Sequence, residues 1–478
     1  MKLAIVVQRY GNEVPGGAEL HARHVAEHLS THAEVEVLTT CARDYVTWRN
    51  ELPPGRDEVN GIPVRRFPVR HPRSVERFGR LSGTVFHQTH SLADELAWLD
   101  AEGPTSPALV NHVRANRSAF DFFLFWSFRY YQAYYGARAV ADKAVLVPTA
   151  EREPAIGVSL FKPLLAGVRG LVYLTPEERD LVSAASGNQH VPSIVAGSGS
   201  EIPPSVEPRR FRQKFGIEGP FAIYVGRIDQ NKGCDELFRF YARYVKREAT
   251  PLPLVLCGNS ILPIPEDPRV RHLGFVSEQD KFDAIAASSL LIMPSYYESL
   301  SIVALEAWAL GVPVLANARC DVLKGQCQRS NAGLFYENWD EFAEALSWFG
   351  RRPEQARALG QNGCAYFQQH YAWPVVERQY RDLLDRLSRE NAAPGPLADP
   401  LPGFWQRRKP VIPPAESVLE SSPTGPSRRC SLRSTRCWPR SVTAMRSGTR
   451  CSASAASCRR RATSRRSSST PWTRGSNT

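Results

Sequence analysis

Two glutamates at a fixed spacing are the first candidates for chemistry in this chain. In MPSYYESLSIVALEAWALGVPVLA (293–316), seven residues separate Glu298 from Glu306, about two turns of helix. The apolar run 290–293 predicts a buried strand, and the spacing of 299–310 predicts a helix that places both carboxylates on nearly one face. A helix N-terminus suits a phosphate and carboxylates suit hydroxyl groups, so the stretch indicates a nucleotide-sugar pocket. The alternative is an amphipathic helix whose glutamates face solvent.

A second group of candidates is basic. GRIDQNKG (226–233) places Arg227 and Lys232 in a loop after a predicted strand at 221–225. A sugar diphosphate that leaves as a nucleotide develops negative charge on its β-phosphate, and two cations there stabilise the transition state more than the ground state. By itself, the segment could equally be a solvated loop.

A glycine pair follows the first predicted strand. Gly16 and Gly17 precede a predicted helix at 18–30, and without a Cβ they let the backbone approach a ligand. A plain helix entry is the alternative. The pattern is not G-x-G-x-x-G, so no dinucleotide fingerprint is indicated.

These residues require a scaffold of alternating strands and helices. Strands are predicted at 3–7, 34–38, 62–69, 120–126, 144–148, 171–174, 193–196, 221–225, 254–257, 272–276, 290–293, 314–316 and 334–336. Helices are predicted at 18–30, 75–100, 107–117, 176–185, 299–310, 339–349, 354–369 and 373–389. This alternation predicts an α/β chain with two parallel sheets and a hinge within 197–215.

Three motifs in this order resemble retaining glycosyltransferases of family 4, in which two Rossmann-like domains form the GT-B fold. They are the E-x7-E pair, YVGRIDQNKG (224–233) and PGGAE (15–19), and LGFVSEQDK and AGLFY also fit. The resemblance extends over roughly residues 1–390. It implies an acceptor domain at 1–197, a nucleotide-sugar domain at 198–372, a helix at 373–390 that packs back on the first domain, and a tail at 391–478.

The resemblance also implies residue roles. Arg227 and Lys232 would contact the diphosphate, Glu298 the hydroxyls of the donor sugar, and Glu306 the ribose. The catalytic set it implies is Arg227, Lys232, Glu298 and Glu151, and the donor-binding set is Gly16, Gly17, Ser299, Leu300, Ser301, Glu306 and Val276.

One position departs from the family pattern. After the strand corresponding to 144–148, these enzymes usually carry a histidine, often within T-A-H-D-E-P, whereas this chain reads T-A-E-R-E-P. Glu151 takes the histidine position and Arg152 that of the acid. A glutamate can bond a sugar hydroxyl, but its charge could be repelled by a diphosphate. A catalytically weak nucleotide-sugar-binding relative or scaffold therefore stays open as the alternative.

The charge of the chain is divided unevenly. The formal net charge of +12 belongs to the end of the chain, because 401–478 holds 16 Lys and Arg against 2 Asp and Glu, whereas 1–400 holds 44 against 46. The tail lacks apolar periodicity, which predicts disorder. Its abrupt change to a composition rich in Ser, Arg and Cys is also typical of translation out of frame. An RNA-associated protein that uses this tail is the alternative, but without interleaved aromatic residues no nucleic-acid partner is expected.

Cysteines, charges and apolar runs set the remaining expectations. The six cysteines before residue 391 show neither metal-site spacing nor the density of a disulfide scaffold, which indicates a reducing, cytoplasmic compartment. There is no evident D-x-D, and the resemblance implies that no metal cofactor is needed. No apolar run approaches the length of a membrane-spanning helix.

Arg65, Arg66, Arg70 and Arg73 are open to two interpretations. They could contact the inner face of an anionic membrane, or they could form a solvated face.

The expected reaction is transfer of a hexose from a nucleotide sugar, such as a UDP- or GDP-hexose, with retention of anomeric configuration. The resemblance implies a glycan or lipid-linked acceptor and a place in glycan or polysaccharide biosynthesis. The sequence itself identifies neither the base, the sugar nor the acceptor.

Overall fold

The computed structural model describes residues 1–14, 16–390 and 397. Pro15, the first residue of the PGGAE motif, and the predicted tail apart from Leu397 lie outside the described residues. Among the described helices, none combines the length and the apolar character of a membrane-spanning segment.

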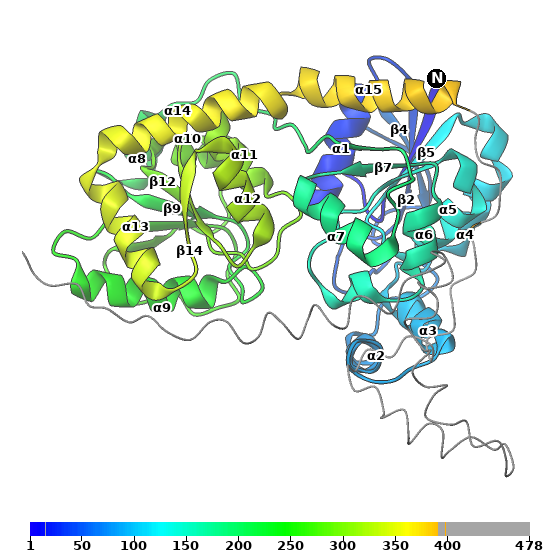
Figure 1. Cartoon of the computed structure of the whole chain (residues 1–478), viewed down its shortest axis with the longest axis horizontal. Helices are drawn as coiled ribbons and strands as arrows, with labels where there is room; N and C mark the ends of the chain where they lie inside the picture. Colours follow the sequence, from blue (N-terminus) through cyan, green and yellow to red (C-terminus); the bar gives the residue numbers. More distant parts are fainter. Residues whose placement is uncertain (15, 391–396, 398–478) are drawn as a thin grey trace, which may run out of the picture. The chain divides into compact units, whose positions relative to one another are not determined.

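The first sheet has eight strands in the order β3-β4-β2-β1-β5-β6-β7-β8. Figure 1 labels its strands β2, β4, β5 and β7. All neighbouring strands are parallel except β3 and β4. The strands are β1 (Lys2–Val6), β2 (Glu34–Thr40), β3 (Gly55–Val59), β4 (Ile62–Phe67), β5 (Phe122–Trp126), β6 (Ala144–Val147), β7 (Gly170–Tyr173) and β8 (Ser193–Val195). We call this sheet and its helices the first α/β unit.

Seven α-helices and three short 3₁₀ turns belong to the first α/β unit. The α-helices are α1 (Gly17–Leu29), α2 (Val75–His87), α3 (Leu92–Glu102), α4 (Pro107–Ala115), α5 (Tyr131–Ala139), α6 (Phe161–Gly167) and α7 (Pro176–Ser186). The 3₁₀ turns are η1 (Arg117–Ala119), η2 (Ala141–Lys143) and η3 (Pro154–Gly157). The single helix predicted at 75–100 is wrong, because Ser91 and Asp94 form a reciprocal capping box that starts α3 as a separate helix.

The hairpin of β3 and β4 was not predicted. Its first strand, GRDEV, is almost entirely exposed and polar, so it carries no apolar signal. The turn residues Asn60 and Gly61 both have positive φ, 52° and 77°. An Asn-Gly pair at such a turn is a hairpin signal that the sequence does contain.

The second sheet has six parallel strands in the order β11-β10-β9-β12-β13-β14. The strands are β9 (Ala222–Val225), β10 (Leu254–Cys257), β11 (Val270–His272), β12 (Leu290–Met293), β13 (Val314–Asn317) and β14 (Gly333–Tyr336). The helices that follow the first unit are α8 (Pro208–Phe215), α9 (Cys234–Arg247), α10 (Glu278–Ala287), α11 (Ile302–Ala309), α12 (Asp321–Ser330), α13 (Trp339–Arg351), α14 (Pro353–His370) and α15 (Trp373–Arg389). Strands β9 to β14 with α8 to α14 form the second α/β unit.

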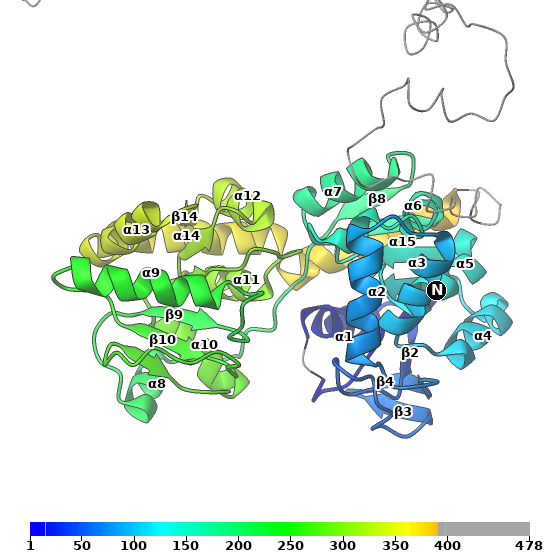
Figure 2. The same cartoon turned by 90° about the horizontal axis from the view of Figure 1, so that it is seen from below.

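Alternation along the buried strands builds a core on each face of the second sheet. Ile223 and Val225 of β9 belong to one apolar cluster, whereas Ala222 and Tyr224 belong to another. Figure 2 shows α9 on one face of this sheet and α8 and α10 on the other. A parallel sheet covered on both faces explains why its strands are continuous apolar runs.

Two elements at the carboxyl edge of this sheet differ from their predicted bounds. The strand predicted at 272–276 is wrong, since β11 ends at His272 and Val276 lies in the loop before α10. The helix predicted from residue 299 starts at Ile302, because Ser301 is its N-cap and has a φ of 68°. A non-glycine residue in the left-handed region does not continue a right-handed helix.

Helix α15 packs on elements of the first α/β unit. It contacts α1 and β8, and Arg169 donates to the carbonyl of Leu387 at 2.7 Å. At its N-terminus, Trp373 stacks on His28 of α1, with ring centroids 4.0 Å apart. A Cβ on Gly199, in the segment after β8, would lie only 2.4 Å from the indole of Trp373. The segment after β8 and the start of α15 are therefore tightly packed against each other.

Candidate active site

The four predicted catalytic residues follow strands β9, β12 and β6. Arg227 and Lys232 follow β9, Glu298 follows its neighbour β12, and Glu151 follows β6 of the first sheet. The carboxyl ends of parallel strands are where α/β proteins bind ligands.

The loop after β9 is closed around one buried acid. Asp229, 3% exposed, accepts a hydrogen bond from the backbone amide of Lys232 at 2.8 Å and a second one from the Arg227 guanidinium. Gly233 ends the loop at a φ of 70°, where a Cβ would lie 2.2 Å from the carbonyl oxygen of Pro294. This close approach to the loop after β12 requires glycine, and it brings the two loops together.

Lys232 and Glu298 form an ion pair across these loops. The Lys232 Nζ lies 2.7 Å from Oε1 of Glu298. Burial alone lowers the pKa of Lys232, but the carboxylates of Glu298 and Glu151 outweigh burial and raise it above its ordinary value. Arg227 is close enough to oppose that rise, so the structure brings all four predicted catalytic residues into one electrostatic cluster.

Glu306 belongs to a different ion pair. Its Oε1 accepts from Lys281 of α10 at 2.8 Å, and no described group bonds its Oε2, although the residue is only 3% exposed. Burial raises the pKa of Glu306, against the lowering effect of Lys281. Because Glu298 precedes α11 and only Glu306 is helical, the prediction that both share one helix face is wrong.

The three residues between Glu298 and α11 form a tight turn. Leu300 and Ser301 are buried, and the carbonyl of Ser299 accepts a hydrogen bond from Thr175 of the first α/β unit at 3.2 Å. Helix α11 thus begins after Ser301, and its unpaired backbone amides are those of its first turn.

The remaining predicted donor-binding residues lie in other loops. Gly16 is the N-cap of α1 at a φ of 145°, and a Cβ there would meet the carboxylate of Glu19 at 2.1 Å. Gly17 begins α1, and its Cβ position faces open space. Val276 is partly buried against the main apolar core. None of these three lines the cavity described next.

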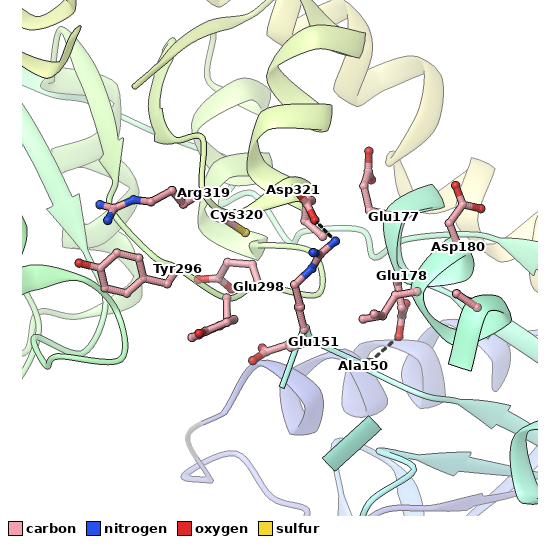
Figure 3. A pocket seen from close by; sticks show the side chains of 15 residues that line it. Ala150, Glu151, Glu177, Glu178, Asp180, Tyr296, Glu298, Arg319, Cys320 and Asp321 are labelled. Carbon is pink, nitrogen blue, oxygen red and sulfur yellow. Dashed lines mark hydrogen bonds and ion pairs between the residues drawn. The ribbon is translucent and has the colours of Figure 1, made fainter. Parts of the chain in front are cut away.

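A cavity of about 370 Å³ lies beside the Lys232–Glu298 pair and draws its wall from both α/β units (Figure 3). Its lining residues are Ala150, Glu151, Arg152, Glu177, Glu178, Asp180, Leu181, Ala184, Tyr296, Tyr297, Glu298, Arg319, Cys320, Asp321 and Val322. Six carboxylates face two guanidinium groups there. Arg152 lies 2.5 Å from Asp321, and Arg319 is paired with Glu236.

Glu178 is the functional candidate that sequence reasoning missed. It is 0% exposed and accepts hydrogen bonds from the amides of Ala150 and Leu174, both at 2.6 Å. Thr175 caps the amide of Glu178, so T-P-E-E signals the start of α7. That signal gives no indication that the glutamate side chain joins the loops after β6 and β7.

Glu151 lines the cavity beside these groups. Burial and the nearby Glu298 carboxylate raise the pKa of Glu151 to about 7, against the lowering effect of Lys232. Burial likewise raises the pKa of Glu178 to about 8, against the hydrogen bonds from Leu174 and Ala150.

Two of the four arginines expected to contact a membrane bond to other parts of the chain instead. Arg66 is 4% exposed and bonds Asp57 and the carbonyl of Tyr10. Arg73 bonds the carbonyl of Glu102 at 2.6 Å. Their interpretation as surface residues is wrong, because both guanidinium groups tie loops of the first α/β unit together.

Potential metal ligands do not cluster in the described part of the chain. Among residues 1–14, 16–390 and 397, no group of three or more His, Cys, Asp or Glu is arranged to hold an ion.

Comparison with known proteins shows the fold of this chain and a family match for part of it. Residues 207–365 match the family described as "Glycosyl transferases group 1". Sucrose-phosphate synthase from Thermosynechococcus elongatus has a similar structure, with a TM-score of 0.60 and 16% identity over 81% of this chain and 99% of that one. HepE of Anabaena, solved with UDP-glucose, has a TM-score of 0.58 and 18% identity over 81% of this chain and 100% of that one. The chain thus has the predicted GT-B fold, and its residues 207–365 are similar to the glycosyltransferase group 1 family.

Sequence relatives cover varying shares of the chain. D-inositol 3-phosphate glycosyltransferase of Corynebacterium kroppenstedtii is 26% identical over 38% of this chain and 44% of that protein. Mannosylfructose-phosphate synthase of Agrobacterium fabrum is 28% identical over 24% of this chain and 31% of that protein. A D-inositol 3-phosphate glycosyltransferase of Corynebacterium urealyticum is 23% identical over 80% of this chain and 93% of that protein. The first two matches thus span less than half of the curated relatives.

Proposed function

We propose that this protein is a retaining, family 4-like glycosyltransferase that moves a hexose from a nucleotide sugar to an acceptor. The observation that carries the proposal is the Lys232–Glu298 pair, with Arg227 beside it, at the adjoining ends of β9 and β12 and next to a cavity. Two cations and an acid there meet the needs of a sugar diphosphate. The group 1 domain match and the HepE structures, solved with UDP and with UDP-glucose, support a nucleotide-sugar donor.

The side chains would contact different parts of the nucleotide sugar. Lys232 and Arg227 would contact the diphosphate, and the negative charge that grows on the leaving nucleotide strengthens these contacts in the transition state. Glu298, released from Lys232, would accept hydrogen bonds from sugar hydroxyls. The unbonded Oε2 of Glu306 would accept one from the ribose.

The glycosyl bond to the diphosphate breaks as the acceptor oxygen forms the new bond on the same face of the sugar. The acceptor proton passes to the departing phosphate oxygen, so no protein base is required. We propose that Lys232, Arg227 and the first-turn amides of α11 supply the positive charge, and that no metal cofactor is needed. Treatment with EDTA should then leave the turnover rate unchanged, and a loss restored by Mg²⁺ or Mn²⁺ would contradict this.

A thermal-shift screen against UDP, GDP and their hexose conjugates, followed by NMR of the product anomer, tests the proposal. A ligand that binds only the folded state raises the melting temperature. We expect one nucleotide series to do so and the transferred sugar to keep its anomeric configuration. Inversion of that configuration would refute retention.

Glu151 motivates a second candidate function, that of a nucleotide-sugar-binding protein without turnover. An ionised Glu151 would repel a bound diphosphate from within the cavity. Tight binding by calorimetry, with neither transfer nor hydrolysis of the donor, would favour this candidate over the enzyme.

A further inference from the structure

The cavity holds more acid than the nearby cations can neutralise. The groups that act on Glu151 are Glu298 after β12, Lys232 after β9, and Glu153 and Arg129 of the first α/β unit. Glu151 in turn raises the pKa of Glu178 of α7. Arg152, the next residue along the chain, is 2.5 Å from Asp321. Glu151 is therefore one of a cluster of four carboxyl groups.

The cations in this set already have partners. Lys232 pairs with Glu298 at 2.7 Å. Arg129 pairs with Glu153 and lies 2.9 Å from Glu102. No side-chain ion pair of Glu151 appears among the described residues, so its carboxyl group faces the cavity beside two other acids without a cation of its own.

Glu178 fixes the backbone that carries Glu151. Its two oxygens hold the amide of Ala150, the residue before Glu151, and the amide of Leu174 after β7. Figure 3 marks the hydrogen bond between Ala150 and Glu178 with a dashed line. Glu178 thus sets the position of Glu151 and also places a second buried carboxyl group near it.

We propose that Glu151 takes part in the reaction as a neutral carboxyl group that donates a hydrogen bond to the donor's diphosphate or sugar, with Glu178 as its positioning residue. This inference rests on the proposed function. A neutral carboxyl group is a donor as well as an acceptor, whereas a carboxylate only accepts. A bound diphosphate adds negative charge beside Glu151 and so favours the neutral form further.

The raised pKa of Glu151 agrees with this role. The pKa of Glu151 is raised to about 7, so lowering the pH below 7 increases the neutral fraction and raising it removes the donated proton. Activity should then fall above neutrality, as the neutral form of Glu151 is lost. Well above the pKa of Glu151 in the donor complex, the fraction of this form falls tenfold with each pH unit.

The test is the pH dependence of kcat/KM for the full-length protein and for Glu151→Gln. The wild type should lose activity as the pH rises through and above neutrality. The amide of glutamine donates a hydrogen bond at every pH, so E151Q should lose the alkaline decline, and its kcat/KM at pH 6 should fall by less than about 100-fold, the scale for loss of one transition-state contact. Loss of more than 100-fold in E151Q at pH 6 would overturn the proposal.

A matched control removes a different acid from the same cavity. Glu177 also lines it but is paired with Arg329. Glu177→Gln should leave the pH of the alkaline decline where it is, whatever its effect on the rate. In Glu178→Gln one acceptor oxygen remains for the amides of Ala150 and Leu174, so the pH of the alkaline decline should change because Glu151 is no longer held in place.

A second measurement does not depend on turnover. Carboxyl ¹³C NMR of protein labelled at glutamate Cδ, with E151Q assigning the resonance, gives the titration of Glu151 directly. A midpoint near 7 supports the neutral carboxyl group, and a midpoint below 5 overturns it. Absence of turnover with every nucleotide sugar would instead refute the proposed function, so the two failures are distinguishable.

Discussion

Lys232 and Glu298 are the residues on which the proposed chemistry depends most directly. Replacing either one with alanine should lower kcat/KM by about 100-fold or more, the scale for loss of one transition-state contact. Steady-state assays with the nucleotide sugar identified by the thermal-shift screen measure the effect. Lys246→Ala, an exposed lysine on α9, is the control and should keep the wild-type rate. Wild-type rates in both K232A and E298A would show that the donor binds elsewhere.

Glu178 should make stability depend on pH. Its pKa is raised to about 8 in the folded protein, mainly by burial, whereas an unfolded glutamate titrates near 4.3. Between these values the folded state binds more protons, so the free energy of unfolding falls as the pH rises, by at most about 1.4 kcal/mol per pH unit. The full contribution of Glu178 to stability is present only below the pKa of glutamate in the unfolded chain.

Urea unfolding at pH 5, 6, 7 and 8 measures this dependence. Glu178→Gln should flatten the decline over that range. It should also be less stable at pH 5, since an amide has one acceptor oxygen for the two backbone N–H groups of Ala150 and Leu174. Parallel curves for the variant and the wild type would contradict the assignment.

The sequence placed Arg227, Lys232, Glu298 and Glu151 after predicted apolar strands, and their catalytic roles were predicted from the family resemblance. It could not show how they are paired. The partner of Glu306 is Lys281, whose position on α10 depends on the packing of a neighbouring helix rather than on local pattern. Glu178 was missed for the same reason, because its role lies in contacts with two other loops.

Individual strands and helices were predictable where an apolar run or a helical apolar spacing extends over the whole element. The apolar runs of β10 and β12 and the helix α15 have the bounds that the pattern predicted. The start of α11 was misplaced because residues 299–301 have helical apolar spacing, yet Ser301 adopts a left-handed conformation that the spacing does not encode. The hairpin strand β3 lacks apolar residues, so only its Asn-Gly turn could have revealed it.

The break between α2 and α3 depends on one cap. Ser91 accepts from the amide of Asp94, and the Asp94 carboxylate accepts from the amide of Ser91 at 2.8 Å. Ser91→Ala should lower the free energy of unfolding by about 0.5–2 kcal/mol, as measured by urea denaturation. Ser91→Thr keeps the hydroxyl group and should lose much less. An equal loss in both variants would show that the cap is not the cause.

At the scale of the whole molecule, the segment after β8 and the start of α15 form one packed connection between the two α/β units. Gly199→Ala would place a methyl group against the Trp373 indole, so it should lower the free energy of unfolding by about 1–3 kcal/mol. Thermal unfolding measures the change. Gly79→Ala is the control, since its Cβ would meet nothing within 4 Å in helix α2, and it should be neutral or stabilising. If both variants unfold like the wild type, the connection is not tightly packed.

The contacts of α15 have a consequence for how the chain is made. Val376, Tyr380 and Leu384 belong to the same apolar cluster as Leu3 and Ile5 of β1, although nearly the whole described chain separates them. On the ribosome, strands β1 to β8 emerge first, but the helix that completes their packing follows roughly 10–40 s later at 5–20 residues per second. During that interval the apolar residues of the first α/β unit that pack on α15 lack their partner, and such exposed apolar surface is prone to aggregation. The half that is synthesised first is therefore the half that matures last.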